Sequence, residues 1–270
     1  GPAMVRAGAK NFDHVAVVTD PHDYPRLLAS LDAGDDEQRA LRRALAAKAF
    51  AHVSTYDSLV SAWLRGGDPL FPEEMTIGLR RASIPKYGEN AHQRAAVYTR
   101  LHPGPAPAGI LGATQLKGDT LSFNNHLDAD AAWNAAQLFG GPTVAIVKHT
   151  VPCGLAVRES LAEAYRAAYE GDTISAFGGI VALNRPVDLK TAREMRKIKL
   201  DIILAPGFND DALELLLKKK GTRILAVPNR QGKRVHELDL RPIAGGLLVQ
   251  EPDLTDESAG GWSLVTDATP

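Results

Sequence analysis

Lys148 and His149 are the two adjacent residues best suited to catalytic chemistry. They follow the apolar run at 144–147 (VAIV), which is typical of a strand covered on both faces. In open α/β sheets ligands bind beyond the carboxyl ends of strands. A histidine there can move a proton near neutral pH, and a neighbouring ammonium can stabilise negative charge. A lone histidine is more often structural. Its position at the end of a buried strand nevertheless favours a functional role here.

Residues 85–94 (PKYGENAHQR) form a second candidate segment. Lys86 can hold a phosphate, and Gly88 can let backbone N–H groups approach it. A solvated polar turn between strands explains the same residues, and taken alone that interpretation is favoured.

Residues 121–133 (LSFNNHLDADAAW) place Asn124 and Asn125 just before a helix expected to begin at Leu127 or Asp128. The two amides can cap that helix or bind a polar ligand at its N-terminus, and the sequence leaves both open.

Residues 173–183 (TISAFGGIVAL) interrupt a strand-like segment with Gly178 and Gly179. Paired glycines indicate close backbone approach to a ligand or a plain bulge. Phe177 beside them could line a pocket for a flat ring.

Two other site classes are excluded. No G-x-G-x-x-G opens a helix, so a dinucleotide site has no support. The sequence 152–154 (PCG) resembles part of a zinc deaminase motif, but that motif needs a second cysteine and an upstream H-x-E. Cys153 is the single cysteine, so no internal disulfide forms, and we expect no metal site.

Composition indicates an ordinary globular protein. Of 270 residues, 44% are hydrophobic and 23% charged, and the formal net charge is -1. Nothing in that balance asks for nucleic acid or an acidic membrane surface. No apolar run approaches the ~20 residues that span a bilayer, and the start has no signal core. We therefore expect a cytoplasmic protein.

The first 70 residues predict one short strand followed by helices. Residues 15–19 (VAVVT) predict a strand and residues 24–31 a short helix. Asp35 is expected to cap a longer helix, with Gln38 as its capping-box partner. Two glycines and two prolines at 65–74 predict a linker and a domain boundary near residue 70, and residues 102–109 predict a surface loop. One apolar face is expected along the helix: Leu41, Leu45, Ala49, Val53, Tyr56, Val60 and Trp63.

Beyond residue 140, apolar runs alternate with helical patterns. This alternation predicts an α/β sandwich with an at least partly parallel sheet. Strands are expected at 143–147, 180–183, 202–204 and 223–227, and helices at 160–169, 189–198 and 212–219.

Together and in this order, the motifs resemble one family. KYGENAHQ is similar to its RYGENPHQ, SFNNHLDADAAW to S-[FY]-N-N-x-x-D-A-D-A-A-W, VKHTVPCG to KHxNPCG, and SAFGGIVALNRPVD to SAFGGIxAxN. LDIILAPGF, RPIAGGLLVQ and the opening GPAMVRAGAKN agree as well. The family is the bifunctional purine biosynthesis enzyme, which joins phosphoribosylaminoimidazolecarboxamide (AICAR) formyltransferase to IMP cyclohydrolase.

The resemblance implies a reaction and a set of roles. Lys148 and His149 match the transformylase catalytic pair. His149 would help remove a proton from the 5-amino group of AICAR as it attacks the formyl carbon of 10-formyltetrahydrofolate, the co-substrate. Lys148 would assist proton transfer and stabilise the oxyanion. The other matching positions are Lys86 and Tyr87 for the nucleotide and its phosphate, Asn125, Gly178 and Asp201 for AICAR, Phe177 where substrate and folate pockets meet, and Lys10 from the cyclohydrolase site.

The same resemblance implies a fold and an assembly. Residues 1–70 would be the C-terminal part of the cyclohydrolase domain, and residues 71–270 the N-terminal half of the transformylase domain. The fold expected for that half is α/β, built of cytidine-deaminase-like units. AICAR and folate are the implied partners, within a homodimer, with no metal, nucleic acid or membrane.

Three positions depart from the family pattern. Lys86 replaces arginine and loses a planar fork that grips phosphate, Ala91 replaces proline, and Val151 replaces asparagine. Both ends of the chain look cut, so each site is expected to be incomplete. The competing hypothesis is a non-catalytic module that binds purine nucleotide or supports dimer assembly; a generic nucleotide-binding α/β domain is a distant third.

Overall fold

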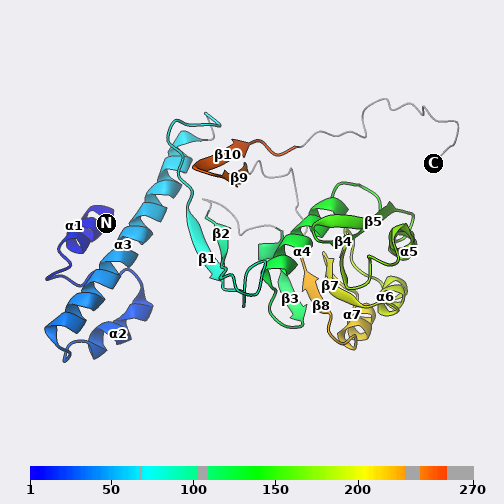
Figure 1. Cartoon of the computed structure of the whole chain (residues 1–270), viewed down its shortest axis with the longest axis horizontal. Coiled ribbons are helices and arrows are strands. Elements are labelled where there is room, and N and C mark those ends of the chain that lie inside the picture. The colour runs from blue at the N-terminus through cyan, green and yellow to red at the C-terminus, as the bar shows by residue number, and fades with distance from the viewer. Residues whose placement is uncertain (67–68, 102–108, 229–237, 254–270) are drawn as a thin grey trace. The chain divides into compact units, whose positions relative to one another are not determined.

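The computed structural model describes residues 1–66, 69–101, 109–228 and 238–253 (Figure 1). Contacts divide the chain into two compact units, Gly1–Pro228 and Asn229–Pro270. The predicted surface loop at 102–109 falls almost wholly outside the described residues.

The first residues form helices: α1 (Pro2–Lys10), a 3-10 turn η1 (Pro21–Asp23), α2 (Tyr24–Ala29) and the long α3 (Asp35–Arg65). The predicted strand at 15–19 is wrong, because these residues belong to no strand. Val17 instead packs its β-branched side chain against the cluster of Ala9, Ala46 and Ala49 between α1 and α3.

Helix α3 corrects two further predictions. Gly34, not Asp35, occupies the N-cap, and no side chain caps that end. Gln38 donates instead to the carbonyl oxygens of Leu31 and Ala33, at 3.1 and 3.0 Å. The predicted apolar face is buried from Leu41 to Val53, whereas Tyr56 and Trp63 are 50% and 68% exposed. The core-packing interpretation therefore holds for the first half of the face.

Helix α3 ends at Gly66, which takes a left-handed conformation with φ 66°. The described residues between it and β1 are irregular, as predicted for this segment. Strands β1 (Leu79–Ser83) and β2 (Val97–Arg100) then pair antiparallel as a small ribbon on either side of residues 85–94, as the interpretation of that segment as a polar turn between strands requires.

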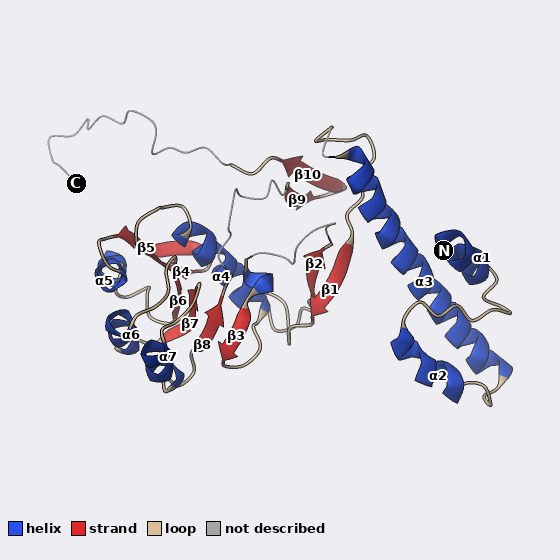
Figure 2. Ribbon diagram, turned by 180° about the vertical axis from the view of Figure 1, so that it is seen from behind, coloured by secondary structure: helices blue, strands red, loops and turns tan. Residues whose placement is uncertain are grey.

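The central element of the first unit is a six-stranded sheet in the order β3-β8-β7-β6-β4-β5 (Figure 2). Strands β6, β7 and β8 are mutually parallel, while β4 runs antiparallel to both β5 and β6, and β3 antiparallel to β8. The expected partly parallel sheet is confirmed. Its strands are β3 (Thr114–Lys117), β4 (Thr143–Lys148), β5 (Val151–Val157), β6 (Gly179–Leu183), β7 (Leu200–Ala205) and β8 (Arg223–Ala226).

Helices cover both faces of this sheet, which makes it an α/β sandwich (Figures 1 and 2). Val144 and Ile146 of β4 face α5, α6 and α7, while Ala145 and Val147 face α4. All four side chains are fully buried, which confirms the strand covered on both faces. The helices are α4 (Phe123–Ala136), α5 (Leu161–Gly171), α6 (Leu189–Arg196) and α7 (Asp210–Leu217), with a 3-10 turn η2 (Ile110–Gly112) before β3.

The second unit contains one described hairpin, β9 (Asp239–Ile243) with β10 (Gly246–Gln250). Gly245 turns it with φ 86°. Across the described parts of both units, no helix is long and apolar enough to cross a membrane.

Candidate active site

The turn between β4 and β5 consists of His149 and Thr150. Both residues have positive φ, 53° and 62°. A two-residue hairpin with positive φ at both positions normally takes Asn and Gly, because other side chains are strained there by about 1–2 kcal/mol each. Backbone strain of this kind is concentrated at functional sites.

Lys148 is the last residue of β4, and its Nζ donates a 3.0 Å hydrogen bond to the carbonyl oxygen of Phe177. The register explains this contact, since Val147 pairs with Ile180 at the start of β6. Because β4 is antiparallel to β6, Lys148 lies where β6 and β7 begin. The predicted place at the carboxyl end of its own strand is confirmed, but β6, β7 and β8 run the other way, so their amino ends lie at this edge of the sheet.

Gly178 immediately precedes β6 and has φ 73°, which favours glycine. Its N–H donates to the carbonyl oxygen of Lys199, at 2.9 Å, and so joins the starts of β6 and β7. A Cβ at Gly178 would lie 3.8 Å from Oδ1 of Asp201. Gly178 and Asp201 are therefore neighbours at one edge of the site. The paired glycines mark a strand start and a close approach rather than an interruption of β6.

Phe177 is 57% exposed, and Nζ of Lys199 lies 5.6 Å from the centroid of its ring. That distance is within cation–π range. A flat apolar face is thus available beside Lys148.

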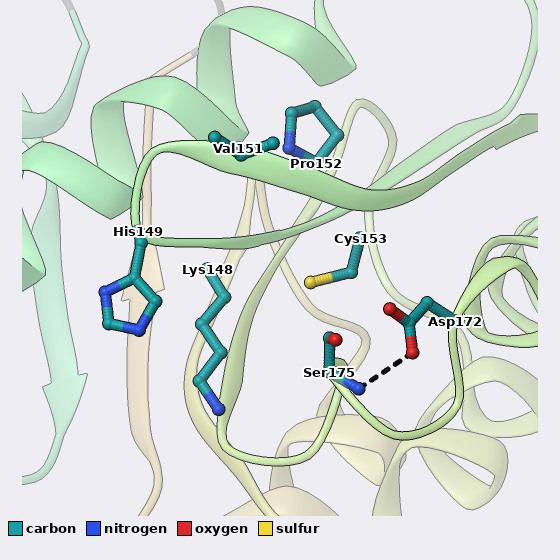
Figure 3. Close-up of a pocket in the computed structure, with 7 residues that line it drawn as sticks. All are labelled: Lys148, His149, Val151, Pro152, Cys153, Asp172 and Ser175. Carbon is teal, nitrogen blue, oxygen red and sulfur yellow. Dashed lines mark hydrogen bonds between the residues drawn. The ribbon is translucent and has the colours of Figure 1, made fainter.

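A pocket of about 440 Å³ opens beside Lys148 and His149 (Figure 3). Figure 3 shows Lys148, Cys153, Asp172 and Ser175 turned toward the same space, with His149 beside it. Hydrogen bonds from Ser175, and one from the Ile174 amide, lower the pKa of the Asp172 carboxyl. A carboxylate and a lysine ammonium therefore line the same pocket.

The single thiol, Cys153, takes part in this electrostatic balance. Burial raises its pKa, Asp172 raises it further, and Lys148 lowers it. The thiolate, the reactive form, is thereby disfavoured near neutral pH. Cys153 thus lines the pocket as a neutral thiol.

The start of helix α4 shows which of the two asparagines, Asn124 and Asn125, takes part in capping. The helix begins at Phe123, four or five residues earlier than predicted, and Ser122 is its N-cap. Oδ1 of Asn125 accepts from the Ser122 N–H, and Oγ of Ser122 accepts from the Asn125 N–H, both at 3.1 Å. Asn125 is thus a capping-box residue, whatever else it contacts.

The loop of Lys86 and Tyr87 is fastened to α4. Asn124 donates from Nδ2 to the carbonyl oxygen of Glu89, at 3.2 Å. The Gly88 N–H is used within the loop, by Gln93 O at 2.8 Å, so it is not offered to a phosphate as expected. The loop contributes to a second pocket of about 460 Å³, lined by Arg81, Ile84, Pro85, Lys86, Arg94, Ala95 and Ala96.

The structure therefore gathers the predicted residues into groups. Lys148, His149, Phe177, Gly178 and Asp201 meet at one end of the sheet. Asn125 stands on α4, and Lys86 with Tyr87 on the loop that α4 holds. Lys10 is exposed at the end of α1, in the helical N-terminal part.

Sequence reasoning missed Asp128. Its Oδ1 accepts a 2.8 Å hydrogen bond from the N–H of Thr150 in the strained turn. The available signal was its place in the motif, three residues after Asn125 and so on a shared helix face. Asp172 and Ser175 were missed too; Ser175 opens the SAFGGIVALNRPVD motif, whereas no motif included Asp172.

Sequence comparison supplies the relationship to known proteins. The family model described as the AICARFT/IMPCHase bienzyme matches residues 8–270. The chain belongs to this family. Across 270 residues it is 44% identical to the bifunctional purine biosynthesis protein PurH of Pediococcus pentosaceus. It is 43% identical over 271 residues to PurH of Limosilactobacillus reuteri, and 43% over 277 to PurH of Myxococcus xanthus.

The match covers 100% of this chain and 52% to 53% of each of these three relatives. The chain therefore spans about half the length of the curated relatives it matches. Membership of the bienzyme family agrees with the resemblance drawn from the motifs.

Proposed function

We propose that this chain belongs to a cytoplasmic, homodimeric enzyme of purine biosynthesis that transfers a formyl group from 10-formyltetrahydrofolate to the 5-amino group of AICAR. IMP cyclohydrolase activity is proposed for the same protein. The support is family membership together with the names of the relatives, which are bifunctional purine biosynthesis proteins.

The observation that carries the proposal is the meeting of separate motifs at one end of the sheet. Lys148 reaches the residue before Gly178, and Gly178 in turn lies beside Asp201. Three motifs separated by 29 and 23 residues along the chain thus contribute to one place. A module that only supported assembly would not need an ammonium, an imidazole and a carboxylate brought together.

The pair can perform both proton transfer and charge stabilisation. The 5-amino group of AICAR is a weak nucleophile because its lone pair is conjugated with the imidazole ring. His149 would accept the proton that this nitrogen loses as the new C–N bond forms. Lys148 has three N–H donors, of which one is used by Phe177 O, so the others remain for the negative charge on the formyl oxygen.

The surrounding residues fit the two substrates. We assign Asp201 and the Gly178 region to AICAR, with Asn125 as a further contact, and Lys86 and Tyr87 to its phosphate. Cations of Arg81, Lys86 and Arg94 line the pocket beside that loop, as an anion requires. The exposed Phe177 ring offers a flat face to the folate, which supplies the one-carbon group when bound. A volume of about 440 Å³ at Lys148 lies in the range of ligand pockets.

We further infer a boundary near residue 70, with residues 1–70 from the cyclohydrolase domain and Lys10 as part of its site. Residues 71–270 then form the first half of a transformylase domain with deaminase-like units. The α/β sandwich that begins after the β1–β2 ribbon is consistent with this assignment.

The test uses the protein at its full natural length, mixed with AICAR and 10-formyltetrahydrofolate. Formyl-AICAR is expected, and His149→Ala should lower kcat roughly 100- to 10,000-fold, as removal of a general base does. Calorimetry should show that AICAR still binds to this variant. His14→Ala, an exposed histidine on the N-terminal part, is the matched control.

The opposite result would favour the non-catalytic module. If the natural-length protein forms no product, while the double variant Lys86→Arg, Val151→Asn does, the chain binds nucleotide without turning it over. If both are inactive and neither binds AICAR, the assignment of the site itself is wrong.

A further inference from the structure

We propose that Asp128 is a positioning residue for His149, because it holds the strained turn that carries the imidazole. This role rests on the formyl transfer proposed above. The direct evidence is the 2.8 Å hydrogen bond from the Thr150 N–H to Oδ1 of Asp128. A bond to a charged acceptor is roughly twice as strong as one between neutral groups.

The turn needs an external restraint. His149 and Thr150 both have positive φ, and for a β-branched threonine this conformation is a genuine outlier. The turn lies at an exposed corner, where Val151 is 63% exposed and β5 is the edge strand. A register shift between Ile146 and Val147 adds local twist just before it. Within the turn, the Thr150 hydroxyl bonds the carbonyl oxygen of its own neighbour, His149, at 2.7 Å, which cannot fix the turn against the rest of the fold.

Helix α4 can supply that restraint because it is fixed to the sheet. Ala129 and Trp133 are 0% and 1% exposed and pack in one cluster with Val147, at the end of β4. Asp128 is half-buried and lies one turn before Ala132, which is 0% exposed, so its place on α4 is fixed beside the face that packs on the sheet. The hydrogen bond therefore ties the turn to the same helix whose capping box contains Asn125.

Asp130 offers a matched control on the same helix. Its Oδ2 accepts a 3.0 Å hydrogen bond from Nδ2 of Asn134, one turn further along α4. Replacing Asp130 removes a carboxylate of the same kind without touching the Thr150 amide. Both variants lose a carboxylate from α4, and only the variant at 128 loses the bond to the turn.

The experiment compares Asp128→Ala, Asp128→Asn and Asp130→Ala in the natural-length protein. Asp128→Ala should lower kcat roughly 10- to 100-fold with KM for AICAR little changed, since a misplacement of about 1 Å can cost about 100-fold. Asp128→Asn keeps an acceptor oxygen and should recover most of the loss, and Asp130→Ala should resemble the parent. Hydrogen exchange of the Thr150 amide, followed by NMR, should accelerate in Asp128→Ala alone.

A second change tests the mechanism of the effect. Glycine adopts positive φ without strain, so Thr150→Gly added to Asp128→Ala should restore part of kcat. If Asp128→Ala alone does not fold, the double variant Asp128→Ala, Thr150→Gly is used for the test. The proposal is overturned if Asp128→Ala lowers Tm but leaves both kcat and Thr150 exchange unchanged, or if glycine at 150 restores folding without restoring kcat.

Failure of the proposed function gives a different pattern. In that case His149→Ala would leave turnover unaffected, or there would be no turnover to measure. Thr150 exchange in the Asp128 variants would still report whether the carboxylate holds the turn.

Discussion

Nζ of Lys148 and the carbonyl oxygen of Phe177 lie 3.0 Å apart, and this hydrogen bond joins the end of β4 to the start of β6. Because the two strands are antiparallel neighbours, the end of β4 and the start of β6 lie side by side at the same edge of the sheet. The hydrogen bond places the Lys148 ammonium next to Phe177 and the left-handed Gly178. The Lys148 side chain is thus oriented by a backbone carbonyl group. A substitution of a neighbouring side chain would leave this acceptor in place.

Asn125 gives a prediction that separates a capping role from ligand binding. Ser122→Ala and Asn125→Ala each break the same capping box, so each should lower the free energy of unfolding by about 0.5–2 kcal/mol. Because Oδ1 of Asn125 accepts from Ser122, a nucleotide contact would fall mainly to its Nδ2. We therefore expect AICAR affinity to fall in Asn125→Ala and to persist in Ser122→Ala, as measured by calorimetry. Equal affinities in the two variants would limit Asn125 to capping.

Much of the sandwich could be predicted because its local signals agree. Each expected strand and helix beyond residue 140 was found, since apolar runs bounded by turn residues are reliable where both faces of a strand are buried. β5 was missed because Pro152 and Gly154 argue against a strand. An edge strand tolerates both residues, and edge position is a tertiary property that a single segment does not reveal.

The site was predicted less completely than the fold. Residue types and motif order identified Lys148 and His149, but the direction of β4 relative to β6 depends on pairing between distant segments. The bond between Asp128 and Thr150 likewise joins residues 22 apart through a turn whose positive φ values no propensity suggests. The strand predicted at Val15 to Thr19 was wrong because β-branched residues can pack against helices without a partner strand.

Gly154, the glycine of the VKHTVPCG motif, should tolerate no side chain. A Cβ there would overlap the carbonyl oxygen of Ala168 in α5, which is backbone and cannot move aside. We expect Gly154→Ala to lower the free energy of unfolding by about 1–3 kcal/mol or more, as overpacking does. Urea unfolding measures it. Gly207→Ala is the control, because nothing lies within 4 Å of its added Cβ, and a similar loss there would refute the steric explanation.

Asn184 of the SAFGGIVALN motif should serve stability rather than chemistry. It is 4% exposed, accepts from the Thr143 N–H at 2.8 Å, and donates to the carbonyl oxygens of Phe139 and Gly141 at 3.0 and 2.7 Å. These contacts lie at the end of β4 opposite Lys148. Because Ala would leave the buried Thr143 N–H unpaired, at about 1–3 kcal/mol, and would also remove two part-buried hydrogen bonds, Asn184→Ala should lower Tm.

The matching control is Asn134→Ala, an exposed asparagine with one hydrogen bond, which should change stability by less than about 0.5 kcal/mol. Binding of AICAR to the folded fraction of Asn184→Ala should equal that of the parent. A loss of affinity without a loss of stability would instead assign Asn184 to the site.

Cys153 provides a probe of the charges around the pocket, because it is the single thiol in the chain. Burial and Asp172 raise its pKa, whereas Lys148 lowers it. Iodoacetamide reacts with the thiolate, so alkylation at about pH 8 should be slower than for a free thiol.

Two substitutions should move the alkylation rate of Cys153 in opposite directions. Asp172→Asn removes a negative charge, which lowers the thiol pKa, enlarges the thiolate fraction and accelerates alkylation. Lys148→Ala removes the positive charge, raises the pKa and slows it. Asp130→Asn makes the same charge change on α4, across the sheet from the cluster against which Cys153 packs, and should leave the rate unchanged. Rates that shift together in the Asp172 and Lys148 variants would show that altered access, rather than charge, governs the thiol, and that the ammonium and the carboxylate do not face one pocket.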